Sequence, residues 1–315
     1  MQAGSRARGG GIRRPAQAYA AVALTVAMWG YSAVAIKAVP ASGIVVAFYR
    51  LWFAIPFLWL SLFLFPRLRG PLDRRWFLGC LAGGALFGFH QLLFFNAMKV
   101  TSVANVTIIG ALQPVLVLLV AGPLFGEYLH RVAIGWSSVA LAGTALVVLG
   151  GATSTAVSIE GDLLALGNLF VFTGYFLMSR RVREYLGAWE YVVGMTTVSG
   201  LVITTASFIA GSDLGAPSGW DWVVLASLAI FPGTLGHVLT NWSHAHITAF
   251  SISMMFLATP VVASASAYFF LGESLTVLQV VGGMIVLGAI GATVVSAEPE
   301  VGQELAESAA GTDAP

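Results

Sequence analysis

The chain has 315 residues, of which 58% are hydrophobic and only 9% are charged, against roughly 25% charged residues in ordinary soluble domains. This composition excludes a water-soluble globular protein. The net charge of +1 is not the basic excess that nucleic-acid binding requires, so no nucleic-acid partner is expected. Cys80 is the single cysteine, which excludes an intramolecular disulfide.

Ten continuous apolar segments follow one another along the chain, each close to the about 20 residues that a membrane-spanning helix needs. Charges and Gly/Pro clusters place them at 17–36, 43–65, 76–97, 102–124, 131–150, 161–179, 189–210, 220–242, 247–271 and 277–296. Strands of a membrane barrel are shorter and alternate in polarity, so the sequence predicts an all-α integral membrane protein. A basic tail (1–16) precedes the spans, and an acidic tail (297–315), expected to be disordered, follows them.

The basic residues are unequally distributed between the two sides of these spans. If the amino terminus lies inside, twelve arginines fall in cytoplasmic segments, Lys37 and Lys99 fall outside, and Arg50 lies within a span. This bias is typical of the positive-inside rule. Ten spans return the carboxy terminus to the starting side. The sequence therefore predicts a multi-pass protein in the lipid bilayer of the cytoplasmic (inner) membrane, with both termini cytoplasmic.

The sequence contains an internal repeat at an offset of 146 residues. This shift aligns Gln113-Pro114-Val115 with Thr259-Pro260-Val261 and Gly126-Glu127 with Gly272-Glu273, with no gap between the two matches. The halves are about 17–150 and 161–296, with five spans each. Because five is an odd number, the second half enters the membrane upside down relative to the first, which gives an inverted repeat suited to alternating access.

The order and spacing of several short motifs indicate a family. They are Met28-Trp29-Gly30, Ala35-Ile36-Lys37, Phe48-Tyr49-Arg50, the stretch from Ala97 to Asn105, and the Gln-Pro, Thr-Pro and Gly-Glu pairs of the repeat. This pattern resembles the EamA-type branch of the drug/metabolite transporter superfamily. The resemblance implies ten helices in two inverted five-helix repeats and efflux or uptake of small metabolites through a central cavity. The second half departs from the family pattern at Gly174-Tyr175, where a Trp is common.

Pro114 and Pro260 lie near the middle of the fourth and ninth spans. Each proline lacks an N–H donor and kinks its helix, so that the carbonyls of Gly110 and Phe256 lose their helical partners. Free carbonyls at this depth are tolerated only against protein or a polar cavity. We expect both kinks to line a cavity, with a simple packing kink as the alternative.

Polar side chains inside the spans are the next candidates, because burying one without a partner costs on the order of 2 kcal/mol or more. His237, Asn241 and His244 share one helical face, and that face is not expected to contact lipid. The alternative is hydrogen bonding between helices. The candidate substrate-binding residues are the polar side chains within the spans together with two aromatic residues. They are Trp29, His90, Gln113, Asn168, Tyr175, His237, Asn241 and Thr259.

Each of four side chains, namely Trp29, Arg50, Glu127 and Glu273, has two interpretations. Trp29 offers an aromatic surface to a substrate or packs in the core. For Arg50 the sequence favours a structural anchor that reaches carbonyls and water near the outer surface, and the alternative is a positive charge for an anionic substrate. For Glu127 and Glu273 it favours capping of the following helices, with a proton relay as the alternative. His237, His244 and His246 have no acidic residue or cysteine nearby, so no metal site is expected.

The function that best fits these features is a secondary transporter that moves a small polar or amphipathic metabolite, such as an amino acid, outward by alternating access. The alternative is a membrane-embedded enzyme acting on a lipid-linked substrate. The spans lack an acid pair, a metal cluster and a nucleophile with a base, so we expect no enzyme and no cofactor. No P-loop is present for ATP hydrolysis. The sequence is compatible with transport by proton coupling, by exchange or by facilitated diffusion, and with a homodimer.

The charge distribution makes a direct prediction about topology. Reporter fusions should place both termini and the segments 66–75 and 180–188 in the cytoplasm, because these segments carry the arginines. A carboxy terminus on the opposite side from the amino terminus would mean an odd number of spans and would remove the basis of the inverted repeat.

Overall fold

A computed structural model describes residues 14–68, 70, 73–126, 131–151, 158–215, 217–272 and 274–310. Within these ranges the chain consists of helices and short turns, without strands. The segments long and apolar enough to cross a membrane are Pro15–Ala38, Gly43–Leu64, Arg74–Val100, Asn105–Phe125, Ile134–Gly151, Ile159–Val182, Ala188–Ile209, Asp221–Ser243, Ala249–Phe270 and Val277–Val294. The predicted class, a helical membrane protein with ten spans, is confirmed.

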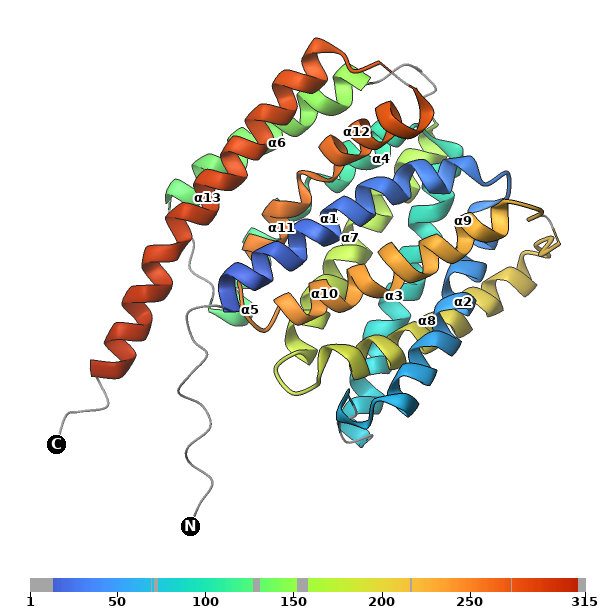
Figure 1. Ribbon diagram of the computed structural model, residues 1–315, viewed down its shortest axis with the longest axis horizontal. Coiled ribbons are helices and arrows are strands. Elements are labelled where there is room, and N and C mark those ends of the chain that lie inside the picture. Colours follow the sequence, from blue (N-terminus) through green and yellow to red (C-terminus); the bar gives the residue numbers. More distant parts are fainter. Residues whose placement is uncertain are drawn as a thin grey trace.

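The two halves each contribute five spans (Figure 1). The first half contains α1 (Arg14–Ala38), α2 (Gly43–Leu64), the short helix η1 (Pro66–Leu68), α3 (Arg74–Val100), a fourth span broken into α4 (Val103–Gly110) and α5 (Gln113–Phe125), and α6 (Arg131–Gly151). The second half contains α7 (Ile159–Val182), α8 (Ala188–Ile209), an eighth span made of α9 (Asp221–Leu228), a π-helical turn η2 (Ala229–Leu235) and α10 (Gly236–Ser243), a ninth span broken into α11 (Ala249–Phe256) and α12 (Thr259–Leu271), and α13 (Val277–Ala310).

The backbone follows the 146-residue offset found in the sequence. Helix α11 starts and ends 146 residues after α4, and α12 starts and ends 146 residues after α5. Both broken spans begin with a side-chain N-cap, Ser102 in one half and Thr248 in the other. Both end at a glycine in the left-handed conformation, Gly126 at φ 68° and Gly272 at φ 70°, where a residue with a Cβ would be strained. The repeat therefore extends to the helix boundaries and caps.

The helix contacts also occur in equivalent pairs. Helix α3 packs on α7 as α10 packs on α1. Helix α3 packs on α8 as α9 and η2 pack on α2, and α1 packs on α12 as α7 packs on α5. The pairs α2 with α8 and α6 with α13 are their own counterparts. Figure 1 shows α6 and α13 side by side along one edge of the molecule. This duplication is the contact pattern expected of two inverted five-helix repeats related by a pseudo-two-fold axis.

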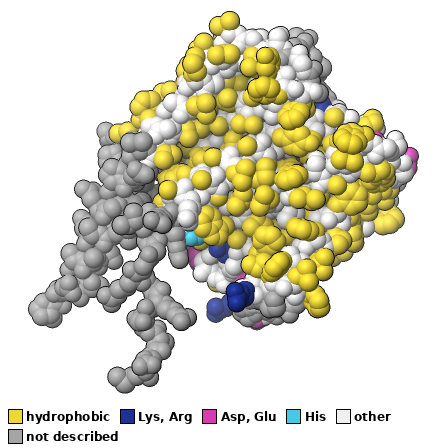
Figure 2. Space-filling view, in the orientation of Figure 1, with side chains coloured by type: hydrophobic (Ala, Val, Ile, Leu, Met, Phe, Trp, Pro, Cys, Tyr) yellow, Lys and Arg dark blue, Asp and Glu magenta, His cyan; other side chains and the backbone are white. Residues whose placement is uncertain are grey.

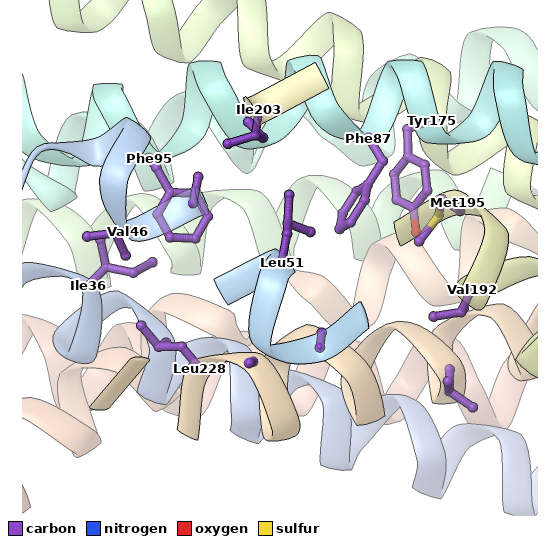
Figure 3. Packing of buried hydrophobic residues seen from close by; sticks show 14 of the residues in the cluster. Ile36, Val46, Leu51, Phe87, Phe95, Tyr175, Val192, Met195, Ile203 and Leu228 are labelled. Atoms are coloured by element: carbon purple, nitrogen blue, oxygen red, sulfur yellow. The ribbon is translucent and has the colours of Figure 1, made fainter. Parts of the chain in front are cut away.

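The interior is packed with apolar side chains drawn from both halves. Figure 3 shows Phe87 beside Tyr175 in one part of the core, and Phe95 with Ile36 and Val46 in another. Helices approach closely at glycines: a Cβ on Gly84 of α3 would lie 2.7 Å from a backbone oxygen of α8, which is the small-residue packing typical of membrane helices. The outer surface is also apolar over much of the face in Figure 2, as expected for contact with lipid.

The carboxy-terminal segment differs from the sequence expectation. Helix α13 continues to Ala310, whereas disorder was predicted from residue 297. The segment after Gly302 is rich in Glu and Ala, which have high helix propensity. Because the preceding span already provides the helical nucleus, the extension does not require the cost of starting a new helix.

Candidate functional site

A cavity of about 160 Å³ lies where the two broken spans face the rest of the bundle. Its lining includes five pairs of positions separated by 146 residues, one member from each half: Thr107 and Ser253, Gly110 and Phe256, Ala111 and Leu257, Gln113 and Thr259, Pro114 and Pro260. We call it the central cavity. Both predicted kinks therefore border the same space, and equivalent parts of the two halves form its wall.

Eight of the ten residues singled out in the sequence line the central cavity. They are Trp29, His90, Gln113, Asn168, His237, Thr259 and the two kink residues Pro114 and Pro260. Tyr175 and Asn241 do not line it; both are buried behind His237, to which they are hydrogen-bonded. Glu127 and Glu273 lie outside the described residues.

Arg50, in the first half of α2, is the charged residue among the described lining residues and is only 5% exposed. Its guanidinium donates to Oε1 of Gln91 on α3 and, at 3.3 Å, to Nε2 of His237 on α10. It also lies over the ring of Phe95, 5.5 Å from the centroid. The favoured sequence interpretation, an anchor reaching carbonyls and water near the outer surface, is wrong, because the partners are side chains beside the cavity.

The hydrogen bond from Arg50 fixes the proton position on His237. A guanidinium can only donate, so Nε2 of His237 accepts and the ring proton lies on Nδ1. Nδ1 then donates to the hydroxyl oxygen of Tyr175 at 3.2 Å, and Nδ2 of Asn241 approaches the same oxygen at 3.4 Å. One chain of hydrogen bonds thus connects three helices, α2, α7 and α10, through Arg50, Tyr175 and His237.

His90 and Asn168 form a second polar contact, between α3 and α7. Nδ1 of His90 lies 2.6 Å from Oδ1 of Asn168, so the histidine nitrogen donates to the amide oxygen. The His90 ring lies 4.6 Å from the ring of Phe172, centroid to centroid. The sequence predicted both polar residues, but not that they bind each other.

The apolar wall of the central cavity is aromatic. The ring of Trp29 lies 4.7 Å from Phe256 and 6.1 Å from Phe172, centroid to centroid. The indole N–H of Trp29 donates to the carbonyl of Pro232 at 3.1 Å, so this ring is held by the π-helical turn η2. The sequence analysis missed Phe172, and it considered Phe256 only for its carbonyl, as the counterpart of Gly110, and not for its ring.

Two polar clusters close the bundle at opposite ends. At the arginine end, which we define by Arg180 and Arg183, the two side chains donate to the carbonyls of His244 and Asn241 and so join the end of α7 to α10. At the lysine end, defined by Lys37 and Lys99, Nζ of Lys99 donates to carbonyls at the end of α1 and Lys37 donates to the carbonyl of Thr101 after α3. Each lysine thus binds backbone acceptors at the carboxy end of the other's helix.

The described residues contain no group of three His, Cys, Asp or Glu side chains placed to hold a metal ion. Cys80 is buried against α8, where its thiol lies 3.8 Å from the carbonyl of Tyr191. The chemistry that the central cavity offers is therefore hydrogen bonding, one positive charge and aromatic contact.

A comparison with protein-family models matches residues 16–149 and again 159–295 to the EamA-like transporter family. The chain belongs to the EamA-like transporter family. The two matched regions correspond to the two halves of the EamA fold, each with five spans. A solved structure titled "Crystal structure of protein" shares this fold, with a TM-score of 0.73 at 18% identity over 88% of this chain and 97% of that one.

Several curated relatives are named as transporters. The uncharacterized transporter YyaM of Bacillus subtilis is 29% identical over 64% of this chain and 67% of its own length. An uncharacterized transporter of Archaeoglobus fulgidus is 25% identical over 86% of this chain and 94% of its own. The aromatic amino acid exporter YddG of Ancylobacter novellus is 28% identical over 50% of this chain and 54% of its own.

The hydrogen-bond chain behind the cavity predicts the effect of Tyr175→Phe. This change keeps the ring but removes the oxygen that accepts from His237, leaving a buried donor unpaired. We expect the free energy of unfolding to fall by about 1 kcal/mol, measured by thermal unfolding of the purified protein in detergent. Tyr185→Phe, at a residue that is 46% exposed, is the matched control. Equal stability of Tyr175→Phe and the native protein would contradict the hydrogen-bond assignment.

Proposed function

We propose that this EamA family member is a secondary transporter that exports a small amphipathic metabolite across the cytoplasmic membrane, with both termini cytoplasmic. The observation that carries the proposal is the central cavity, whose wall uses equivalent positions of two inverted halves. In such an architecture the two halves can exchange conformations, so that one binding site opens first to one side and then to the other. The name of the Ancylobacter relative, an aromatic amino acid exporter, supports export and an aromatic substrate.

The position of the central cavity along the bundle also supports alternating access. The lining residues of α1, from Trp29 to Ile36, lie in the half of that helix nearer the lysine end. Towards the arginine end, the buried Tyr175 and Asn241 and the two arginine–carbonyl contacts fill the space between α7 and α10. We interpret this arrangement as a state in which the arginine end is closed.

The size and lining of the cavity limit the substrate. A cavity of about 150 Å³ holds a benzene molecule, and the central cavity measures about 160 Å³. The substrate that we propose therefore has a body about as large as one aromatic ring. In the part of the chain that the structure describes, the lining contains no Asp, Glu or Cys side chain, so no observation favours the alternative of an enzyme acting on a lipid-linked substrate.

Filling the cavity tests the proposal. Gly110 lines the cavity, and nothing lies within 4 Å of the position where its Cβ would be, so Gly110→Leu places its side chain into open space. Gly135 of α6 is equally open and does not line the cavity, which makes Gly135→Leu the matched control. The measurement is an untargeted comparison of metabolites inside and outside cells that produce the native protein, either variant or no protein.

We expect cells with the native protein and with Gly135→Leu to export at least one small amphipathic metabolite, and cells with Gly110→Leu to lose this export by at least about tenfold. The loss is large because a blocked cavity excludes the substrate rather than weakening one contact. Repeating the measurement with and without a proton gradient reports on proton coupling. No metabolite difference between cells with and without the native protein, or full export by Gly110→Leu, would contradict the proposal.

A further inference from the structure

We propose that the central cavity selects an organic anion, namely a carboxylate attached to a single aromatic or apolar ring, over zwitterions, neutral amides and amines of the same size. Arg50 and Gln113 are the donors to the carboxylate. This inference rests on the proposed function for its biological meaning, but it concerns binding and can be tested without transport.

The first observation is a buried positive charge without a counter-charge. Arg50 is 5% exposed, and its hydrogen-bond partners, Gln91 and His237, are both neutral. No Asp or Glu forms an ion pair with it in the part of the chain that the structure describes. Charged side chains within membrane spans are costly unless they are paired, and a carboxylate in the cavity would supply the missing partner.

The second observation is that the Arg50 guanidinium has N–H donors left for a further hydrogen-bond acceptor. A guanidinium has five N–H donors, and the two hydrogen bonds to Gln91 and His237 use one on each terminal nitrogen. The backbone of η2 passes close by: a Cβ on Gly233 would lie 3.3 Å from Nε of Arg50. The group is therefore held on several sides by protein while remaining part of the cavity wall.

The third observation is an unpaired donor in the same cavity. Gln113 is 3% exposed and lines the cavity, and its Nε2 has no hydrogen-bond partner. A buried donor without a partner is unfavourable, and an acceptor on the substrate removes this cost. A carboxylate has two oxygens with about four acceptor sites, which is enough to accept from Arg50 and Gln113, both of which line the cavity.

The fourth observation concerns the amino group of a substrate. Among the described residues, the cavity lining contains no Asp or Glu that could pair with an ammonium. The nearby acidic groups are bound elsewhere: Asp162 accepts from Thr101 and Asn105 at the lysine end, and Glu190 accepts from the backbone of Gly187 at the arginine end. An ammonium in the cavity would instead be close to the positive charge of Arg50 and would be repelled by it.

The remaining wall determines the rest of the substrate. Trp29, Phe172 and Phe256 pack against one another on the apolar side of the cavity, and the volume of about 160 Å³ matches one ring. Aromatic side chains bind a flat ring by stacking and edge contacts. The four probes that follow from these observations share a phenyl ring and a short chain: 3-phenylpropanoate, 3-phenylpropanamide, phenylalanine and phenethylamine.

The first experiment measures binding of the four probes to the purified native protein, from the increase of its unfolding temperature with ligand concentration. We expect 3-phenylpropanoate to bind at least about tenfold more tightly than each of the others. The amide and the amine have no carboxylate to pair with Arg50, and phenylalanine adds an ammonium that Arg50 repels. Equal binding of the four probes, tighter binding of phenylalanine or phenethylamine, or no binding of 3-phenylpropanoate at millimolar concentration would overturn the inference.

The second experiment uses variants of the two donors. Arg50→Gln should weaken binding of 3-phenylpropanoate by about ten- to a hundredfold and leave 3-phenylpropanamide nearly unchanged, while Arg50→Lys should retain part of the preference for the anion. Gln113→Leu should weaken the anion less than Arg50→Gln does. Arg181→Gln, at an exposed ion pair with Glu184, is the control and should bind as the native protein does. If Arg50→Gln does not fold, the native probe series and Gln113→Leu still decide the question.

The two proposals fail in different ways. If 3-phenylpropanoate binds preferentially but cells with the protein export nothing, the anion site stands and the transport proposal fails. If cells export a cation or a zwitterion and the probe series shows no preference for the anion, transport stands and the anion site fails.

Discussion

The structure depends on one constraint, which is that a backbone N–H or carbonyl in the membrane interior must find a partner inside the protein. In the described spans, three prolines coincide with a break or a π-helical turn, whereas Pro56 and Pro123 lie inside α2 and α5 without ending them. Pro114 and Pro260 interrupt the fourth and ninth spans, and Pro232 lies in the π-helical turn of the eighth. All three interruptions lie at or beside the central cavity: the first two prolines line it, and the carbonyl of Pro232 accepts from Trp29, which also lines it. Irregular backbone and cavity therefore occur together.

The π-helical turn is also where the two halves differ. Its counterpart in the first half, α3, continues as an α-helix from Arg74 to Val100, whereas the eighth span contains η2. The close approach of Gly233 to Arg50 and the bond from Trp29 to Pro232 both involve this turn. The pseudo-symmetric halves thus form the paired walls of the cavity. The π-helical turn, where the symmetry is lost, contacts the charged side chain of Arg50 and the ring of Trp29. This asymmetry is where a member of the EamA family can acquire a preference for one class of substrate.

The sequence predicts much of this architecture because hydrophobic length, arginine distribution and the 146-residue offset are local signals. The offset identifies equivalent positions in the fourth and ninth spans, and the structure extends this equivalence to the bounds of α4, α5, α11 and α12 and to their glycine caps. The offset does not predict that the Arg50 side chain lies beside the cavity, because its partners, Gln91 and His237, come from spans that are distant in sequence. Nor does it separate Tyr175 and Asn241, which lie behind His237, from the lining itself: a helical face identifies which residues point inward, but only packing determines how deep each one lies.

The central claim is that one cavity is reached in turn from the two sides of the membrane. The chain has a single cysteine, Cys80, which is buried and can be replaced by alanine to give a cysteine-free background. In that background, Gly110→Cys places a thiol at the open position in the cavity, and Gly135→Cys is the control outside it. The measurement is labelling by a membrane-impermeant thiol reagent applied separately to each side of the membrane. The account predicts that Gly110→Cys is labelled from both sides, and that a ligand in the cavity protects it from both. Labelling from one side only, with or without ligand, would contradict alternating access.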